Sequence, residues 1–393
     1  MTDATTPAAK ARAQAVVAEQ SDALLALSHA IHAAPEIAWQ EVRSSALVSE
    51  ALAAGGYAVT SGVAGMPTAF AASVGGGPLH VAILAEYDAL PGIGHACGHN
   101  IIAASAVGAG LALVPLADEL GLTVHVLGSP AEEIGDDGGK QRLIAAGAFD
   151  DVHLAMMVHP AAYEVVDPPM IAASMFEVRY TGVAAHAAMH PEQGVNAADA
   201  MTVAQVAIGL LRQALLPTVR VHGIVTHGGE APNIIPAYAT ARYIVRGWTI
   251  DELESVRPRV LRCFEAGAIA TGAGLEIVGG QAPYAEVRHD AGLAASYKAN
   301  AEALGRTFSE PEMLRSRGSG STDMGNVSQV VPTIHPYVRI ETGGAVNHQP
   351  EFAAAAATPS GDRAVLDGAV AMAWTSIDAA TDPELRRRLL AGG

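Results

Sequence analysis

Short apolar segments typical of β-strands alternate with helical stretches along the first 160 residues, and this alternation restricts the fold more than any other feature. We expect strands at residues 68–74, 79–84, 122–127 and 152–158, and helices at residues 16–31 and 41–54 and within the apolar stretch 101–117. Strands that alternate with helices are typical of an α/β domain with a parallel or mixed sheet. The run Gly75-Gly-Gly-Pro78 between the first two strands predicts a hairpin.

A different order of elements is expected between residues 172 and 281. The pattern predicts strands at 175–181, 219–226, 238–247 and 275–278, and helices at 195–216 and 249–271. Thr249 and Glu252 form a capping-box pattern at the start of the second helix. The order β-α-β-β-α-β is that of a ferredoxin-like module. After residue 281 the α/β pattern resumes and ends in a helix opened by Asp382-Pro383.

We therefore predict a discontinuous α/β domain, residues 1–171 and 282–393, with a mixed sheet flanked by helices. A smaller ferredoxin-like α+β domain, residues 172–281, is inserted in it. No internal repeat or low-complexity linker is found.

Charge and composition exclude several classes of protein. The 393 residues carry 23 Lys and Arg against 40 Asp and Glu, a formal net charge of −17. Nucleic acids and anionic membrane surfaces bind basic faces, so neither is expected as a partner. Two cysteines exclude a disulfide framework, and the first 20 residues lack the apolar core of a signal peptide. The apolar stretch 101–117 is broken by Pro115 and is too short to span a bilayer, so we expect a buried helix and a cytoplasmic protein.

The densest cluster of chemically active residues follows the strand at 79–84. It runs from Glu86 through Asp88, His95, Cys97 and His99. Ligands of open α/β sheets bind beyond the carboxyl ends of the strands. Cys97 and His99 are two residues apart around a glycine, and both residue types bind zinc and similar ions. Taken alone, this pair is more typical of a buried cysteine beside ordinary histidines than of a metal site.

Three more segments at strand ends or in loops carry candidate ligands. Glu132 and Glu133 follow the strand that ends near residue 128, His159 follows the strand at 152–158, and His348 lies in a polar loop before an alanine-rich helix. Adjacent carboxylates are costly unless a cation neutralises them, although a solvated acidic turn is also compatible with this pair. Four such segments together predict a two-metal site.

These motifs resemble the aminoacylase, carboxypeptidase and dipeptidase family of co-catalytic metallopeptidases. The resemblance covers nearly the whole chain, and its motifs stand in the family's order before His348. They are Ile31-His-Ala-Ala-Pro-Glu36, Asp88-Ala-Leu-Pro91, His95-Ala-Cys-Gly-His99, Pro130-Ala-Glu-Glu133, Gly182-Val-Ala-Ala-His186 with Gly194-Val-Asn196, Pro232-Asn-Ile-Ile-Pro236, and Gly320-Ser-Thr-Asp323. The implied fold is a zinc-exopeptidase-like catalytic domain with an inserted lid and dimerisation domain.

The resemblance implies two divalent metal ions, zinc or manganese, with cobalt or nickel as alternatives. The implied ligands are Cys97, His99, Glu133, His159 and His348. Glu132 is then the general base that takes a proton from the attacking water and passes it to the leaving amine.

Three residues of the inserted domain complete the implied site. His186 stabilises the tetrahedral oxyanion and reaches across a homodimer, while Asn233 and Arg246 hold the substrate carboxylate. Arginine suits this task because its planar guanidinium binds a carboxylate through two parallel hydrogen bonds. The expected substrate is therefore a small N-acyl amino acid or dipeptide with a free carboxylate.

Several motifs depart from the family pattern. Glu86 stands in Leu84-Ala-Glu-Tyr-Asp88 where much of the family has Arg-x-Asp, and Asn100 follows His99 in place of Asp. Asp323-Met-Gly-Asn-Val and His335-Pro-Tyr also differ from the hippurate hydrolase type. These variants resemble the p-aminobenzoyl-glutamate hydrolase and β-alanyl-lysine-type dipeptidase branch and leave the substrate open.

Two other functions remain as alternatives to amide hydrolysis. The same metal site suits a hydrolytic deaminase acting on an aromatic amine. A non-catalytic metal-binding scaffold of the same fold is the other alternative, but Glu132 argues against it because a scaffold needs no general base.

Overall fold

The computed structural model describes residues 5–309 and 311–392, and the chain divides into two compact units. Unit 1 comprises Met1–Ile134, Gly138–Pro169 and Val287–Gly393, and unit 2 comprises Gly135–Asp137 and Met170–Glu286. The sequence analysis places the boundaries after residues 171 and 281, close to these divisions.

A six-stranded mixed sheet forms the centre of unit 1, with the order β1-β2-β4-β3-β5-β11. Its strands are β1 (Ala58–Ser61), β2 (Phe70–Gly75), β3 (Leu79–Glu86), β4 (Leu122–Ser129), β5 (Leu154–Met156) and β11 (Thr333–Ile334). The last four are mutually parallel, whereas β1 and β2 are antiparallel to their neighbours. A separate parallel pair joins β6 (His159–Ala161) to β12 (Tyr337–Arg339).

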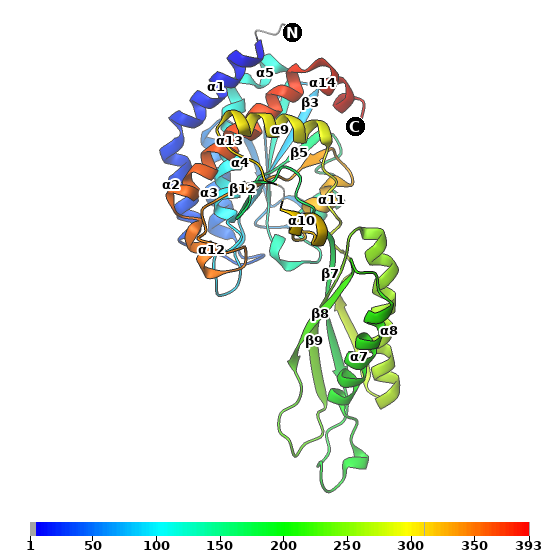
Figure 1. The fold of residues 1–393 in the computed structure, drawn as a ribbon. Helices are drawn as coiled ribbons and strands as arrows, with labels where there is room; N and C mark the ends of the chain where they lie inside the picture. Colours follow the sequence, from blue (N-terminus) through cyan, green and yellow to red (C-terminus); the bar gives the residue numbers. More distant parts are fainter. Residues whose placement is uncertain (1–4, 310, 393) are drawn as a thin grey trace. The chain divides into compact units, whose positions relative to one another are not determined.

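Helices surround this sheet, as Figure 1 shows. They are α1 (Thr5–Glu19), α2 (Ser21–His32), α3 (Val42–Ala54), α4 (His99–Leu113), α5 (Ala117–Leu120), α6 (Gly139–Ala145), α9 (Ala291–Ala303), α10 (Glu312–Arg317), α11 (Met324–Ser328), α12 (Pro350–Ala355), α13 (Pro359–Thr381) and α14 (Pro383–Leu390). The α/β fold class predicted from the alternation of elements is confirmed.

Helix α4 is the central helix of unit 1. It packs against β3 and β4 and is covered by α13. Gly108 permits this close packing, because a Cβ there would lie 2.8 Å from the Ala369 Cβ. The segment His99–Leu120 is apolar and long enough to cross a membrane, but 83% of its apolar window is buried inside the protein. The prediction of a buried helix is therefore confirmed.

Two local predictions are wrong. β2 and β3 do not form a hairpin, because β4 lies between them and pairs with both. The Gly75–Pro78 segment instead passes close to the start of β4, where a Cβ on Gly77 would lie 1.9 Å from the Gly121 carbonyl carbon. The helix expected at 16–31 is two helices that meet at Gln20.

Unit 2 contains a four-stranded antiparallel sheet with the order β10-β7-β9-β8. Its elements are β7 (Ala172–Thr181), α7 (Ala197–Leu211), β8 (Arg220–His227), β9 (Tyr238–Gly247), α8 (Ile250–Thr271) and β10 (Gly274–Gly279). Both helices pack against the sheet (Figure 1). The Thr249 side chain accepts a hydrogen bond from the Glu252 amide, so the expected N-cap forms. Helix α8 continues through Pro258.

Candidate metal centre

The candidate ligands gather at the carboxyl ends of three parallel strands. Glu86 and Ser129, the last residues of β3 and β4, are register partners, and β5 runs parallel to β3 on its other side. The chain segments that leave these strands therefore emerge at one edge of the sheet, where α/β proteins bind ligands. Asp88 follows β3 within two residues, and Glu132 follows β4 within three.

Cys97 and His99 are brought to this edge by a tight turn. Gly98 between them has φ +73° and is the N-cap of α4. A Cβ at this position would lie 2.5 Å from the Pro160 Cγ, so glycine also permits the His159–Pro160 segment to approach. Cys97 is 7% exposed and His99 is fully buried.

Two buried carboxylates fix the turn that carries Glu132 and Glu133. Glu41 Oε1 accepts hydrogen bonds from the amides of Ala131 and Trp39, each at 2.9 Å. Asp88 Oδ2 accepts one from the Glu133 amide at 3.0 Å. Ala131 has φ +58°, a conformation that costs a non-glycine residue free energy. The two carboxylates therefore act on the backbone of this turn and hold its unusual conformation.

His348 approaches the same turn from a distant part of the sequence. Its amide donates to the Ala96 carbonyl at 3.0 Å, directly beside Cys97. The Asn347 side chain donates to the Pro160 carbonyl at 3.2 Å. These two hydrogen bonds join the loop before α12 to the segments that carry Cys97 and His159.

The five predicted metal ligands therefore come together in two overlapping groups. The ligand atoms of Cys97, His99 and His159 lie within 4.8 Å of one another, and so do those of Cys97, Glu133 and His348. Cys97 belongs to both groups. Such a pair of groups could hold two ions that share the cysteine sulfur.

The residues predicted in the inserted domain all lie in unit 2. His186 forms an isolated bridge with Ile234, and its Nδ1 accepts hydrogen bonds from the amides of Ala188 and Met189 at 3.2 Å. The Asn233 carbonyl accepts one from the Ala187 amide, so the His186 and Asn233 segments run side by side.

Arg246 lies at the other end of the same ladder. β7 and β9 pair from Thr181↔Tyr238 to Ala172↔Gly247, and Arg246 faces Ala173. The eight steps along the strand from Tyr238 to Arg246 span about 26 Å at roughly 3.3 Å each. The pairing continues beyond Tyr238 through the Gly182–Ala237 and Ala185–Ile235 hydrogen bonds, so Asn233 does not fold back along the strand. Within one chain, Asn233 and Arg246 therefore cannot hold the same carboxylate.

A model of the peptidase family M20/M25/M40 matches residues 82–366. The chain belongs to this family. Xaa-Arg dipeptidase of Mus musculus is 40% identical over 390 residues, which cover 96% of this chain and 90% of the mouse protein. The human Xaa-Arg dipeptidase is 38% identical with the same coverage. One of the p-aminobenzoyl-glutamate hydrolase subunits of Escherichia coli is 33% identical over 258 residues, 60% of this chain and 53% of that protein.

Solved structures share the M20 fold. An aminobenzoyl-glutamate utilization protein from Klebsiella pneumoniae has a TM-score of 0.68 at 21% identity, covering 89% of this chain and 96% of its own. A dinuclear metal-binding peptidase of the M20 family from Bacillus subtilis has a TM-score of 0.66 at 22% identity, covering 91% and 97%. With the family-model match and the Xaa-Arg dipeptidase relatives, the chain is an M20-family hydrolase, and the predicted metallopeptidase class is confirmed.

The donor set fits the divalent metals of an M20 peptidase. His99 Nε2 and Glu133 Oε1 are buried and have no hydrogen-bond partner among the residues the structure describes. A sulfur, imidazole nitrogens and a carboxylate are the usual zinc ligands. Burial opposes the protonation of His99, but Asp88, Glu86 and Glu133 outweigh it and raise its pKa to about 10. A site that stabilises positive charge so strongly favours cation binding.

Burial and neighbouring carboxylates also act on the acidic groups. Burial, and then the charges of Glu86 and Glu133, raise the pKa of Glu132. Burial and Glu133 likewise raise the pKa of the Cys97 thiol. A bound dication reverses this effect, because a thiol that coordinates a metal is deprotonated.

Sequence reasoning gave no role at the site to three residues that lie against this centre. Glu86, Lys140 and Asp323 are fully buried, and Lys140 Nζ lies 2.5 Å from a carboxylate oxygen of each of the other two. The sequence offered one clue to Lys140, because it is one of only three lysines in the chain. Its carboxylate partners are 54 and 183 residues away, so no spacing could identify them.

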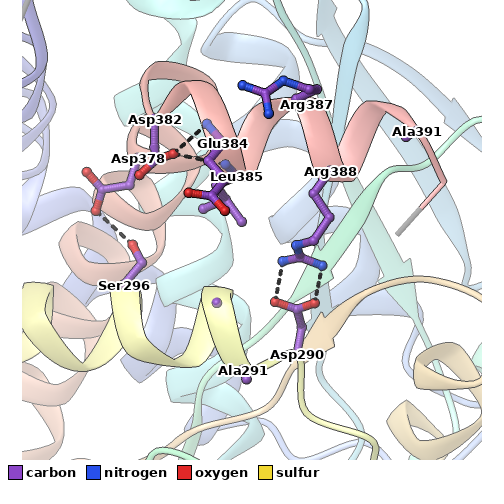
Figure 2. A pocket seen from close by; sticks show the side chains of 11 residues that line it. Asp290, Ala291, Ser296, Asp378, Asp382, Glu384, Leu385, Arg387, Arg388 and Ala391 are labelled. Atoms are coloured by element: carbon purple, nitrogen blue, oxygen red, sulfur yellow. Dashed lines mark hydrogen bonds and ion pairs between the residues drawn. The ribbon is translucent and has the colours of Figure 1, made fainter.

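A cavity of about 860 Å³ in unit 1 is lined by the start of α9, the end of α13 and helix α14. Figure 2 shows its charged lining, in which Arg388 binds Asp290 through two hydrogen bonds of 2.7 and 2.8 Å. Asp378 accepts a hydrogen bond from Ser296 and pairs with Lys10. The described residues that line it include no histidine, no cysteine and none of the predicted ligands. We therefore assign the chemistry to the metal centre.

The buried carboxyl group of Glu41, which fixes the turn beside Glu132, should make the stability of the fold depend on pH. Burial raises the pKa of Glu41 from its ordinary value near 4.5 to about 7. Because the pKa is higher in the folded state, ionised Glu41 increasingly destabilises the fold as the pH rises from about 4.5 through 7. We expect the stability of Glu41→Gln, which keeps the acceptor for Ala131, to rise relative to wild type by about 2–3 kcal/mol as the pH increases from 5 to 8.

Urea unfolding of the metal-free proteins across this pH range measures the difference. Exposed Glu119→Gln is the control and is expected to follow the wild-type curve. Parallel pH curves for wild type and Glu41→Gln would contradict the raised pKa.

Proposed function

We propose that this M20-family hydrolase binds two divalent metal ions and releases a basic amino acid from the carboxyl end of dipeptides. The observation that carries the proposal is the convergence of Cys97, His99, His159, Glu133 and His348 into two groups that share one cysteine. Hydrolysis of dipeptides or N-acyl amino acids agrees with the names of the relatives described above.

Each ion has three ligands in this proposal. Cys97, His99 and His159 hold one, and Cys97, Glu133 and His348 hold the other. When bound, the ions polarise the scissile carbonyl and lower the pKa of the attacking water. The donor types suit zinc and also manganese, cobalt or nickel.

Glu132 serves as the general base. It is 7% exposed, and a carboxylate oxygen lies within 4.8 Å of the ligand atoms of His99 and Glu86. The turn fixed by Glu41 and Asp88 holds its backbone, so it can accept a proton from the attacking water and deliver it to the leaving amine. The amine then leaves as the free amino acid.

Alanine variants of Glu132 and Glu133 should separate metal binding from catalysis. We expect Glu132→Ala to keep both ions and lose about 10²–10⁴-fold in kcat, as for other missing general bases. Glu133→Ala should instead reduce the bound metal. Metal analysis of the purified variants beside steady-state kinetics makes the comparison. The reverse pattern would show that the two roles are exchanged, and wild-type activity after exhaustive chelation would exclude metal catalysis.

A basic leaving residue is favoured over an acidic one. Both Xaa-Arg dipeptidases match nearly the whole chain, whereas the p-aminobenzoyl-glutamate hydrolase subunit matches 60% of it. A net charge of −17 also raises the local concentration of cationic substrates and repels anionic ones. Hydrolysis of p-aminobenzoyl-glutamate is the second candidate function.

A matched substrate series distinguishes these functions. We expect kcat/KM for Ala-Arg and Ala-Lys to exceed that for Ala-Leu at least about tenfold, and this advantage should shrink as salt screens the charge. Ala-Arg amide should be a poor substrate, because it lacks the carboxylate. Preference for p-aminobenzoyl-glutamate would select the second candidate, and release of ammonia from an aromatic amine would indicate a deaminase.

A homodimer would bring together substrate-binding residues that lie far apart within unit 2 of one chain. His186 and Asn233 lie at one end of the β7–β9 ladder and Arg246 about 26 Å away, so one substrate cannot contact both sets from the same chain. We propose that the partner subunit's His186 completes each site. Exposed apolar residues on α7 and on edge strand β8, including Leu210 (73%) and Ile224 (65%), support an interface there.

Complementation between inactive variants tests this arrangement. A heterodimer of Glu132→Ala and His186→Ala chains contains one site with an intact Glu132 and the partner's His186, so about half of the wild-type activity per dimer should return. Each homodimer should be nearly inactive. Tandem affinity tags isolate the heterodimer, and an inactive heterodimer would place His186 in its own chain's site.

A further inference from the structure

A buried lysine fixes one oxygen of Glu86 beside the metal centre. Glu86 ends β3, and its Oε1 lies 2.5 Å from Lys140 Nζ. The same Nζ lies 2.5 Å from Asp323 Oδ1, while the Lys140 amide donates to Asp323 Oδ2 at 2.9 Å. All three residues are fully buried. The ion pairs therefore define the position of the Glu86 carboxylate with no contribution from solvent.

The second oxygen of Glu86 faces His99. Glu86 Oε2 lies 3.5 Å from His99 Nε2, and neither atom has a hydrogen-bond partner among residues 5–309 and 311–392. The other ring nitrogen, His99 Nδ1, lies 3.0 Å from Asp88 Oδ1 and donates its hydrogen there. When His99 is neutral, Nε2 therefore presents a lone pair to the Glu86 oxygen. Two buried lone pairs in this position need a proton or a metal ion between them.

The separation of these two atoms fits coordination to one ion. Zinc binds imidazole nitrogen at about 2.0–2.1 Å and carboxylate oxygen at about 2.0–2.2 Å. Two such bonds at the tetrahedral angle place their ligand atoms roughly 3.4 Å apart. The Glu86 and His99 atoms are 3.5 Å apart before any ion is considered.

We propose that Glu86 is a further ligand of the metal ion held by His99, and that Lys140 and Asp323 position it. This proposal rests on the two-metal function proposed above. Glu86 binds through Oε2 alone, because Lys140 retains Oε1. Its carboxylate adds a hard, negative donor to Cys97, His99 and His159, which favours manganese at this position more than those three ligands alone would.

Glu86→Gln tests the proposal, because it keeps the shape of the side chain and removes its charge. Residues that only support a ligand typically cost about 10–100-fold in metal affinity. We expect Glu86→Gln to weaken the affinity for one of the two ions by more than about 100-fold, and manganese more than zinc. Competition with a chelator measures both affinities, and metal analysis gives the number of ions bound.

Asp323→Asn is the matched control, since it removes one charge from the same cluster without facing His99. We expect its affinity loss to remain within the supporting range of about 10–100-fold. Cobalt-substituted Asp323→Asn should also keep the wild-type visible spectrum, whereas the spectrum of Glu86→Gln should change. Equal losses and identical spectra in the two variants would overturn ligation by Glu86.

A measurement on the wild-type protein tests the proposal even if the variants do not fold. A crystal structure of the zinc-loaded enzyme should place Glu86 Oε2 about 2.0–2.2 Å from an ion, and a distance beyond roughly 3 Å would overturn the proposal. The wild-type metal content separates the two hypotheses. Fewer than two ions would contradict the proposed function, whereas two ions with Glu86 distant from both would contradict only the role of Glu86.

Discussion

Repulsion among buried carboxylates at the carboxyl edge of the unit 1 sheet is the constraint on which the site depends. Glu86, Asp88, Glu132 and Asp323 are buried at or near this edge, and Lys140 neutralises only part of their charge. Isolated charges of this kind are costly in a protein interior. Two divalent ions would balance them, so metal binding and the stability of this edge are coupled.

The remainder of unit 1 holds this charged edge in a fixed geometry. Parallel pairing of β3 with β4 brings Glu86 beside the segment that carries Glu132. The carboxylates of Glu41 and Asp88 fix the intervening backbone through amide hydrogen bonds instead of facing the solvent. A rigid backbone matters for catalysis, because a general base acts only within hydrogen-bond reach of the proton that it removes.

The length of the sheet in unit 2 keeps its predicted substrate-binding residues far apart. About 26 Å of strand β9 lies between Arg246 and Tyr238, the end of the strand next to the His186 and Asn233 segment, and no side-chain rotation closes that distance. The residues that family resemblance assigns to one substrate therefore cannot all serve it within one chain. The homodimer proposed above would remove this conflict, because the partner subunit would supply the second set of residues.

The sequence by itself determined the elements and the kinds of ligand. The alternation of apolar strands with helices predicted the α/β class, and local patterns predicted the Thr249 cap and the buried helix α4. Cys97, His99, Glu133 and His159 could be found because each follows a recognisable strand, and His348 because it stands in a polar loop before a helix. The family resemblance then assigned these residues their roles.

Only the tertiary structure decided the sheet order and the surroundings of these ligands. The expected hairpin of β2 and β3 failed because long-range pairing with β4 overrides the local turn signal. Lys140 meets Glu86 and Asp323 across 54 and 183 residues, and Glu41 reaches Ala131 across 90. Such contacts have no periodicity along the chain, because they arise from the packing of segments that are distant in sequence.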